Sequence, residues 1–301
     1  MSIKSVIFLG GILVSCFRVQ AMTVHHPVGP GLIGFNTKDG RNFVLEMIEG
    51  AMAASEEKYG KYKLEPMVKM NTWDRLLSAQ TIKTYPNVVI RGSAIDSRKD
   101  KTDKTHWWNR WMIVPIPLNM GLNGYRLSLI HRDSQNKFMT LASLPQLKSS
   151  GMKAGQGDWA DADIIKHNGI EVIIGRSYEG LFGMLDIGRF DFFPRALTEI
   201  YGEIETRQQK YPNLVVEDRI AIYYSLPRVL LVAKGNTKLA ERLDFGLRTM
   251  FKNGSHRKIW EYYNKKFIDK SHLNTRKIIR LENPFVTDGL PERDSDFWYK
   301  P

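Results

Sequence analysis

The chain predicts an α/β protein built as two lobes that are joined by two extended crossing segments. Apolar runs of strand length alternate with amphipathic helical segments in residues 22–93 and again in residues 141–218. Two further stretches, Gly124–His131 and Ala221–Val232, are long and largely apolar. A chain that leaves one lobe, builds a second and returns forms a two-strand hinge, and such hinges allow closure around a ligand.

The first α/β unit is expected to contain a mostly parallel sheet flanked by helices, because its strands and helices alternate. Helices are expected at Asn42–Ser55 and Thr72–Ala79, and residues 99–110 form an exposed loop. The expected strands and extended segments are Met22–Ile33, Tyr62–Met67, Asn87–Ile90 and Trp111–Leu118.

The second unit repeats the alternation. Ser177 is expected to cap a helix that Gly188 ends, and the apolar strand Phe190–Phe193 follows. Pro194 and Arg195 then lie where the strand gives way to a loop, the edge at which open α/β sheets bind ligands. The other expected helices are Leu141–Leu147, Asp158–His167, Leu197–Gln208, Asn236–Gly254 and Lys258–Phe267. The other expected strands are Gly151–Gly157, Ile170–Ile174, Leu214–Asp218 and Ala221–Ala233, and residues 272–301 form a surface tail.

The N-terminus has the pattern of an export signal. Lys4 precedes an apolar run from Val6 to Phe17 that is shorter than the roughly 20 residues needed to span a bilayer. Val19-Gln20-Ala21 offers small residues at the positions that a signal peptidase reads, which predicts cleavage after Ala21. Residues 1–21 are then a signal peptide, and the mature protein is expected in the periplasm. The alternative is a lipoprotein processed at Cys16, the single cysteine of the chain. Without a second cysteine, stability must come from the core.

The chain is basic, with a formal net charge of +12. The leader contributes two of these charges, so its removal leaves +10. Such a balance fits nucleic acid, an acidic surface or an anionic ligand. No zinc-finger spacing, RNA-binding motif or basic low-complexity tail is present, which argues against a nucleic-acid partner. No metal-ligand cluster or phosphate-binding loop is present either, so no metal or cofactor is expected.

Three segments resemble the bacterial extracellular solute-binding proteins of family 3. Leu144–Leu147 with Gly151–Gly157 (LPQL, GMKAGQG) is similar to the family's DLKG and GVQxGT segments. The stretch from Tyr178 to Asp191 is similar to its helix followed by L..GRVDA. LLVAKGN, ending at Asn236, is similar to VRKGNPEL. The resemblance implies the type II periplasmic-binding-protein fold, with lobe I at residues 22–130 and 223–301 and lobe II at 131–222. The tail from about residue 268 belongs to lobe I.

The resemblance also implies where a ligand would bind. Ser93 and Arg98 match a segment in which an arginine holds the ligand carboxylate bidentately, although Ile95 replaces a hydroxyl residue. Gly157 matches a loop that presents backbone N–H groups to the same anion at a helix N-terminus. Here Asp158 and Trp159 follow it, Asp158 serving as a helix cap and Trp159 stacking on the ligand or packing. The alternative for Arg98 is a surface salt bridge.

The main departure from the family is at Arg195. Amino-acid binders place an aspartate near this position to hold the ligand ammonium, whereas Arg195 would repel an ammonium and attract an anion. Tyr178 and Arg126 are further candidate ligand contacts, and Arg126 could instead form a structural ion pair at the hinge.

The resemblance implies a monomeric periplasmic protein that delivers a small anionic or polar, amino-acid-like ligand to an ABC importer. Two alternatives stay open. One is a receptor for a membrane sensor, and the other is a dehydratase-like enzyme of the same fold. Acid–base chemistry in the enzyme would fall to Asp158, Glu179 or Asp191.

Overall fold

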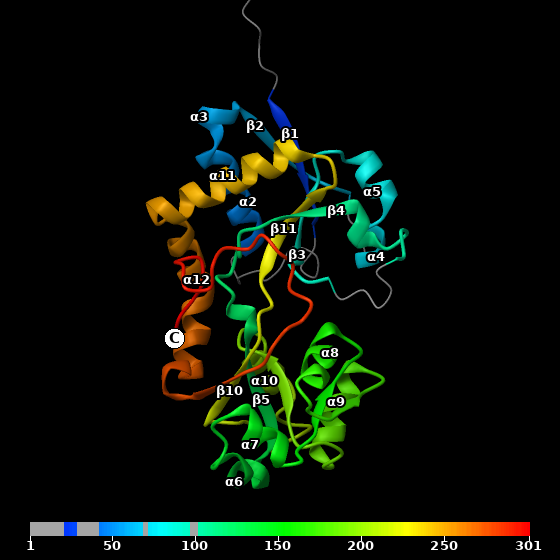
Figure 1. Cartoon of the computed structure of the whole chain (residues 1–301), viewed down its shortest axis with the longest axis vertical. Helices are drawn as coiled ribbons and strands as arrows, with labels where there is room; N and C mark the ends of the chain where they lie inside the picture. The colour runs from blue at the N-terminus through cyan, green and yellow to red at the C-terminus, as the bar shows by residue number, and fades with distance from the viewer. Residues whose placement is uncertain (1–20, 29–41, 69–71, 97–101) are drawn as a thin grey trace, which may run out of the picture.

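Two groups of sheets lie one above the other along the long axis of the protein (Figure 1). The computed structural model describes residues 21–28, 42–68, 72–96 and 102–301. Helices pack against the sheets in both groups, which we call the upper and lower lobes as they stand in Figure 1. The predicted two-lobed α/β fold is confirmed.

The upper lobe is built on β3 (Val89–Ser93), which pairs antiparallel with β11 (Arg228–Ala233). On its other side β11 pairs with β4 (Trp111–Val114), again antiparallel. β1 (Met22–His26) and β2 (Tyr62–Pro66) form a parallel pair, and a bridge between His25 and Val88 joins this pair to the sheet. The helices of this lobe are α2 (Phe43–Ala54), α3 (Glu56–Tyr59), α4 (Trp73–Leu76), α5 (Ala79–Thr84), α11 (Thr237–Asn253) and α12 (Ser255–Ser271).

The lower lobe is organised around β5 (Tyr125–His131). One edge of β5 pairs antiparallel with β8 (Phe193–Ala196), and the other pairs with β9 (Leu214–Val216) and β10 (Ile220–Tyr223). β12 (Lys277–Arg280) extends the sheet beyond β10, and β6 (Ala154–Gln156) pairs with β7 (Val172–Ile174), both in parallel. The helices are α6 (Gln135–Phe138), α7 (Leu144–Ser149), α8 (Ala160–His167), α9 (Tyr178–Asp186) and α10 (Ile200–Glu205). Single 3₁₀ turns are η1 (Trp107–Arg110), η2 (Leu122–Gly124), η3 (Arg132–Ser134) and η4 (Leu273–Thr275).

The sheets are mixed, and in this respect the expectation of mostly parallel sheets is wrong. Every ladder made by β5 with β8, β9 or β10, and by β11 with β3 or β4, is antiparallel. The expected strand 221–233 is also two strands, because Ser225–Pro227 leaves the lower sheet and enters the upper one. The first crossing between the lobes was expected at Gly124–His131. Most of that stretch is β5, which belongs to the lower sheet, so the chain crosses before β5 begins. Buried apolar side chains line that crossing: Ile116, Leu118, Met120 and Leu122.

Pro194 and Arg195 lie inside β8, where the sequence predicts a loop. Pro194 is opposite Ser128 of β5, and Arg195 is opposite Leu127. Proline has no N–H to give a ladder, but no donor is needed here. The other side of β8 faces β6, and among the described residues the backbones of the two segments form a bridge only just before β8, between Ala154 and Phe192. Further along, the Gln156 side chain donates to the Pro194 carbonyl at 3.1 Å.

Residues 272–301 do not form the expected surface tail. Lys277–Arg280 forms β12, and the chain then returns to the upper lobe, where Val286 bridges to Ile95. Trp298 is buried, its ring lying against Gly121. The lobes are therefore connected more than twice. The predicted limits between the lobes, at residues 130 and 223, stay a prediction. Because β5 and β12 pair with β10 in the lower sheet, limits near residues 124, 225 and 276 fit the strand pairing better.

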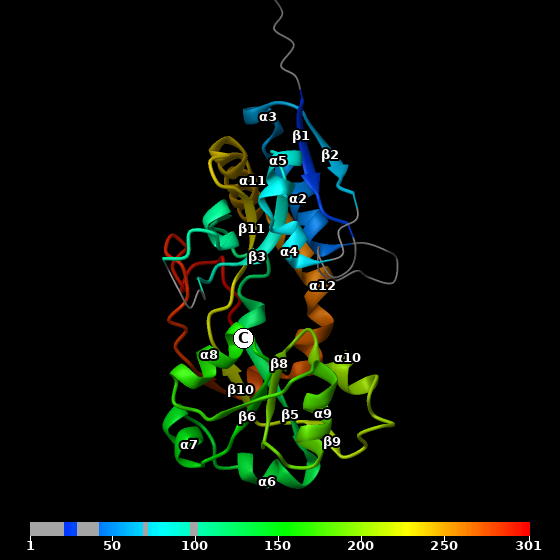
Figure 2. The ribbon, with the colours of Figure 1, turned by 90° about the vertical axis from the view of Figure 1, so that its right-hand side faces the viewer.

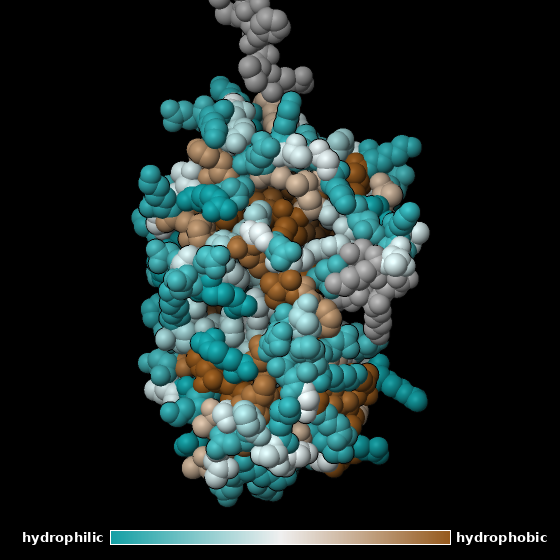
Figure 3. Space-filling view, in the orientation of Figure 1, coloured by the Kyte–Doolittle hydropathy of each residue, from teal (hydrophilic) through white to brown (hydrophobic). Residues whose placement is uncertain are grey.

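The long helix α12 also reaches the lower lobe, as two views show (Figure 1, Figure 2). Lys270 pairs with Glu205 at 2.6 Å, and its carbonyl accepts a hydrogen bond from Tyr201 at 2.9 Å. Apolar patches appear over both lobes of an otherwise mostly hydrophilic face (Figure 3). In the described part of the chain, no helix combines the length and apolarity that crossing a membrane requires. The predicted leader, residues 1–21, lies outside the described residues except for Ala21.

Candidate ligand-binding cleft

A cavity of about 240 Å³ opens at the edge of the upper sheet where β3 ends and β11 begins. Two arginines and two tryptophans dominate its wall, and the described residues that line it include no carboxylate. The lining residues are Trp73, Leu77, Arg91, Gly92, Ser93, Ile95, Trp107, Arg228 and Leu231. A concave, largely apolar cavity with a few polar groups is the usual form of a small-molecule site.

Arg228 holds the polar end of this cavity. Pro227 starts the strand, and the pairing of Arg228 with Ser93 lets its Nη1 donate to the Ser93 hydroxyl at 2.8 Å. Within the described ranges no carboxylate lies within 4.0 Å of the Arg228 guanidinium. Burial lowers the pKa of Arg228, and Glu199 of the lower lobe acts in the opposite direction. No carboxylate among the described residues of the upper lobe therefore pairs with the charge of Arg228.

Arg91 brings a second cation to the same wall. Its guanidinium lies 5.0 Å from the centre of the Trp73 ring, a cation–π distance. Burial and the nearby charge of Arg228 lower the pKa of Arg91 to about 9, so it remains protonated at neutral pH. Because the two guanidinium groups repel each other, an anion that enters the cavity would stabilise both.

Gly92 keeps the cavity open. A Cβ atom at this position would lie 2.4 Å from Cδ1 of Leu231, a fully buried side chain in the adjacent strand. Real Cβ contacts are never so short, so any larger residue would displace Leu231. Glycine at this position therefore leaves room for the Leu231 side chain, which itself lines the cavity.

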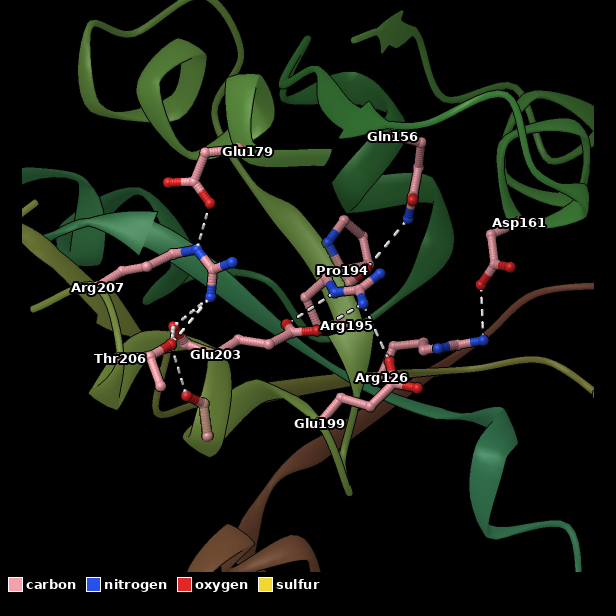
Figure 4. Close-up of polar contacts among 11 residues, drawn as sticks. Arg126, Gln156, Asp161, Glu179, Pro194, Arg195, Glu199, Glu203, Thr206 and Arg207 are labelled. Carbon is pink, nitrogen blue, oxygen red and sulfur yellow. Dashed lines mark hydrogen bonds and ion pairs between the residues drawn. The ribbon is translucent and has the colours of Figure 1, made fainter. Parts of the chain in front are cut away.

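The lower lobe presents a different arrangement of charges (Figure 4). Arg126 of β5 pairs with Asp161 of α8 at 2.6 Å, and the Tyr224 hydroxyl donates to the same carboxylate oxygen at 2.5 Å. Burial alone would raise the pKa of Asp161, but Arg126 and the hydrogen bond from Tyr224 hold it below its usual value. Arg126 thus forms the structural ion pair that was the alternative to ligand binding.

Arg195 is held more tightly still. Its Nε and Nη2 donate to the two oxygens of Glu203 at 2.8 and 2.6 Å, and Nη2 also reaches Glu199 at 3.0 Å (Figure 4). The guanidinium lies 5.1–5.3 Å from the ring centres of Trp159, Tyr178 and Phe193. Although burial opposes the charge, Glu203 and Glu199 raise the pKa of Arg195 above its usual value. The expectation that Arg195 offers an unpaired charge to a ligand does not fit these contacts.

The remaining lower-lobe candidates gather around Arg195. Gly157 is buried under the Trp159 ring, which a Cβ on Gly157 would meet at 2.5 Å. Trp159, not Asp158, is the N-cap residue of α8, and 37% of its surface is exposed. Burial and a hydrogen bond with Glu203 raise the pKa of Tyr178. Ser177 caps α9 as expected, accepting from the Gly180 N–H at 3.1 Å.

The candidates from sequence divide into three groups. Ser93 lies in the upper cavity, whereas Arg98 falls outside the described residues. The other five form the lower-lobe cluster: Arg126, Gly157, Trp159, Tyr178 and Arg195. Sequence reasoning missed Trp73, Arg91 and Arg228 as site residues. One signal for Arg228 was available, since it is a lone arginine within an otherwise apolar run.

The carboxylates proposed for acid–base catalysis have other roles. Asp191 pairs with Lys137 at 3.0 Å and accepts from the Lys153 N–H at 2.9 Å. Glu179 pairs with Arg207 at 2.9 Å, and Asp158 is exposed. Among the described residues, no group of His, Cys, Asp and Glu side chains is arranged to hold a metal ion.

No family model and no curated protein matches the chain. It is similar to several solved structures, among them an ancestral arginine-binding protein bound to arginine, at 17% identity and a TM-score of 0.46 over 80% of this chain and 97% of that one. The L-cystine solute receptor of Neisseria gonorrhoeae matches at 16% identity and a TM-score of 0.46, covering 81% of this chain and 93% of the receptor. A histidine kinase sensor domain with similarity to periplasmic binding proteins matches at 17% identity and a TM-score of 0.48. The match covers 81% of this chain and 96% of the sensor domain. Identity this low says nothing about the ligand of this chain.

Proposed function

We propose that this protein is an exported solute-binding protein, a divergent member of family 3, that captures a small anionic molecule between its lobes. The observation that carries the proposal is Arg228. Its guanidinium lies in a cavity wall, has a hydroxyl as its only hydrogen-bond partner in the described structure, and is free of carboxylates within 4.0 Å. A planar guanidinium is well suited to bind a carboxylate through two parallel hydrogen bonds.

Closure of the lobes would complete the site. The upper wall supplies Arg228, Arg91 and Ser93, and the lower lobe supplies Glu199, whose charge acts on both arginines. A ligand shifts the lobes toward closure only if it binds the closed form more tightly than the open form. The repulsion between Arg91 and Arg228 is the same in both forms, because both residues belong to the upper lobe. The preference of a bound anion for the closed form would therefore come from contacts that it makes with the lower lobe.

Delivery to an ABC importer and a periplasmic location belong to the same proposal. They rest on the resemblance of the three sequence segments and on the leader pattern. A membrane sensor is the alternative partner, since it would use the same ligand-closed form. The carboxylates considered for catalysis are paired or exposed on the surface, so no observation favours the enzyme.

The test is ligand binding by the purified mature protein. Calorimetry and thermal shift with carboxylate metabolites should find at least one ligand with one-to-one stoichiometry. Arg228→Met should weaken its binding at least tenfold. Arg257→Met, which removes an exposed arginine paired with Glu261 on α12, is the matched control and should bind normally. Unchanged affinity in Arg228→Met, or no binding of any anion, would overturn the proposal.

A further inference from the structure

The C-terminal segment, Leu281–Tyr299, contacts both lobes and both of the crossings at residues 115–124 and 225–227. It leaves β12 in the lower sheet and returns to the upper lobe, as the orange to red trace shows (Figure 1, Figure 2). The segment is therefore a further covalent link between the lobes, beside the crossings that the sequence predicts.

The lower lobe holds the chain on both sides of β12. Before the strand, Arg276 pairs with the fully buried Glu217 at 3.6 Å and donates to the Ile220 carbonyl at 3.1 Å. After the strand, the side chain of Asn168 accepts from the Glu282 N–H at 2.9 Å and donates to the Glu282 carbonyl at 2.7 Å. Because Asn168 directly follows α8 and is itself buried, Glu282 is fixed to the body of the lower lobe.

The upper lobe holds the same segment three residues later. The backbone of Phe285–Thr287 pairs antiparallel with that of Ala94–Asp96, through hydrogen bonds of 2.7 and 3.1 Å. Ile95, at the centre of this pairing, lines the upper cavity. The segment is therefore fastened to the edge of the candidate binding site.

Only Asn283 and Pro284 separate the two anchors. Since consecutive Cα atoms are about 3.8 Å apart, the Cα atoms of Glu282 and Phe285 can lie at most about 11 Å from each other. Proline fixes one torsion angle of this short linker. Asn283 also donates to the Ser225 carbonyl at 2.6 Å, which ties the linker to the second crossing. The linker thus limits how far this edge of the cavity can move away from α8.

The end of the segment covers a turn in the first crossing. Met120 has a φ of +50°, which is uncommon for a residue with a side chain, and Gly121 follows with a φ of +71°. The buried Trp298 ring lies against Gly121, and the Tyr299 N–H donates to the Met120 carbonyl at 2.8 Å. The torsion angles of this turn cannot change without displacing the ring.

We propose that Leu281–Tyr299 is a hinge clamp that sets the separation of the lobes when no ligand is bound. Its linker, Asn283 with Pro284, limits opening beside the upper cavity. Its end holds the turn in the first crossing. The clamp acts whichever ligand the protein binds, so this inference goes beyond the proposed function and can fail independently of it.

Lengthening the linker tests the clamp. The sequence Gly-Ser-Gly-Ser-Gly would be inserted between Asn283 and Pro284 of the mature protein. The matched control carries the same insertion between Asp288 and Gly289, two exposed residues that follow the pairing with Ala94–Asp96. The control insertion therefore leaves the link between the lobes at its original length.

Spin labels would report the separation of the lobes without ligand. Glu241→Cys on α11 and Lys148→Cys on α7 place one label on an exposed position of each lobe. A protein that begins at Met22 has no other cysteine, because the chain contains only Cys16. Pulsed electron paramagnetic resonance should show a distance distribution at least twice as broad in the lengthened protein as in the parent and the control.

Equal distributions in all three proteins would overturn the inference and leave the proposed function intact. If the lengthened protein does not fold, Asn283→Ala provides the same comparison, because it removes the bond to Ser225. It should broaden the distribution by a smaller factor, and an unchanged distribution would again overturn the clamp.

Trp298→Ala tests the other end of the clamp. Met120, Leu122 and Gly124 donate backbone hydrogen bonds within the turn. Their amides should exchange with solvent deuterium at least tenfold faster in the variant, while the amides of β3 and α8 keep their rates. Tyr262→Ala, which removes a half-exposed ring of α12, is the control and should leave all of these rates unchanged. Unchanged exchange in the turn, or an equal increase throughout both lobes, would contradict a specific role for Trp298 at the hinge.

Discussion

Arg126 and Arg195 of the lower lobe each pair with carboxylates of their own lobe, whereas Arg228 of the upper lobe donates to a serine hydroxyl. The side chains have the same chemistry but different surroundings. In the lower lobe the charges are neutralised before any ligand arrives, so the arginines organise the protein itself. In the upper lobe no described carboxylate pairs with Arg228. The comparison shows that an arginine in a cleft indicates a ligand only when its own fold does not already supply its anion.

The largest expected effect is in the lower lobe, on Arg195. Arg195→Met removes the partner of Glu203 and Glu199, two partly buried carboxylates, and the loss of stability should approach the value of about 3–5 kcal/mol that is found for broken buried pairs. Urea unfolding at pH 7 should show this loss. The double variant Arg195→Met/Glu203→Leu should recover part of it, because the unpaired charge is removed as well. A fully stable single variant would contradict a structural role for Arg195.

Asp161→Asn tests the second lower-lobe pair and its pH dependence. The folded pKa of Asp161 lies below its unfolded value near 3.9, so its stabilising effect is present above about pH 4 and is lost as the pH falls through the folded pKa. At pH 7 the variant should lose about 3 kcal/mol. The difference from the parent protein should shrink as the pH is lowered below about 4 in denaturant titrations. A difference that is constant with pH would argue against the ion pair.

Gly92→Ala tests the upper cavity. The new methyl group must displace Leu231, and overpacking of this kind costs about 1–3 kcal/mol. The cavity should also become smaller, so the affinity for a bulky anion should fall by more than the affinity for acetate. Gly188→Ala is unsuitable as a control because Gly188 has a φ of +71°. Gly202→Ala, with open space around its Cβ position, is suitable.

The smallest expected effect on stability is that of Arg228→Met. No carboxylate depends on Arg228 in the described structure, and its removal relieves repulsion with Arg91, which burial and Arg228 together hold at a lowered pKa. Thermal and urea unfolding should therefore change by no more than about 1 kcal/mol, the net contribution of the one hydrogen bond to Ser93 that is lost. The same variant should lose ligand binding. A loss of several kcal/mol would place Arg228 in the same class as Arg195.

Local signals in the sequence determined much of the fold. Asn42, Ser177 and Asn236 cap α2, α9 and α11 as side chains of this type do, and each accepts from the backbone N–H three residues later. Apolar periodicity located β1, β5 and most helices within a few residues. These features depend on neighbours along the chain, which is why they can be read without the structure.

Tertiary structure decided which arginines are neutralised. Arg195 meets Glu199 and Glu203 because β8 continues through Pro194 before the chain turns into α10, and proline normally argues against such a strand. Arg126 forms an ion pair with Asp161, which lies 35 residues away in the sequence, and Arg228 donates to Ser93, which lies 135 residues away. The sequence by itself determined that basic residues and tryptophans would be present near a hinge between two α/β lobes. Only the folded chain decided which charge would remain for a ligand, since Coulomb energy depends on distance in space and on burial, and neither follows from separation along the chain.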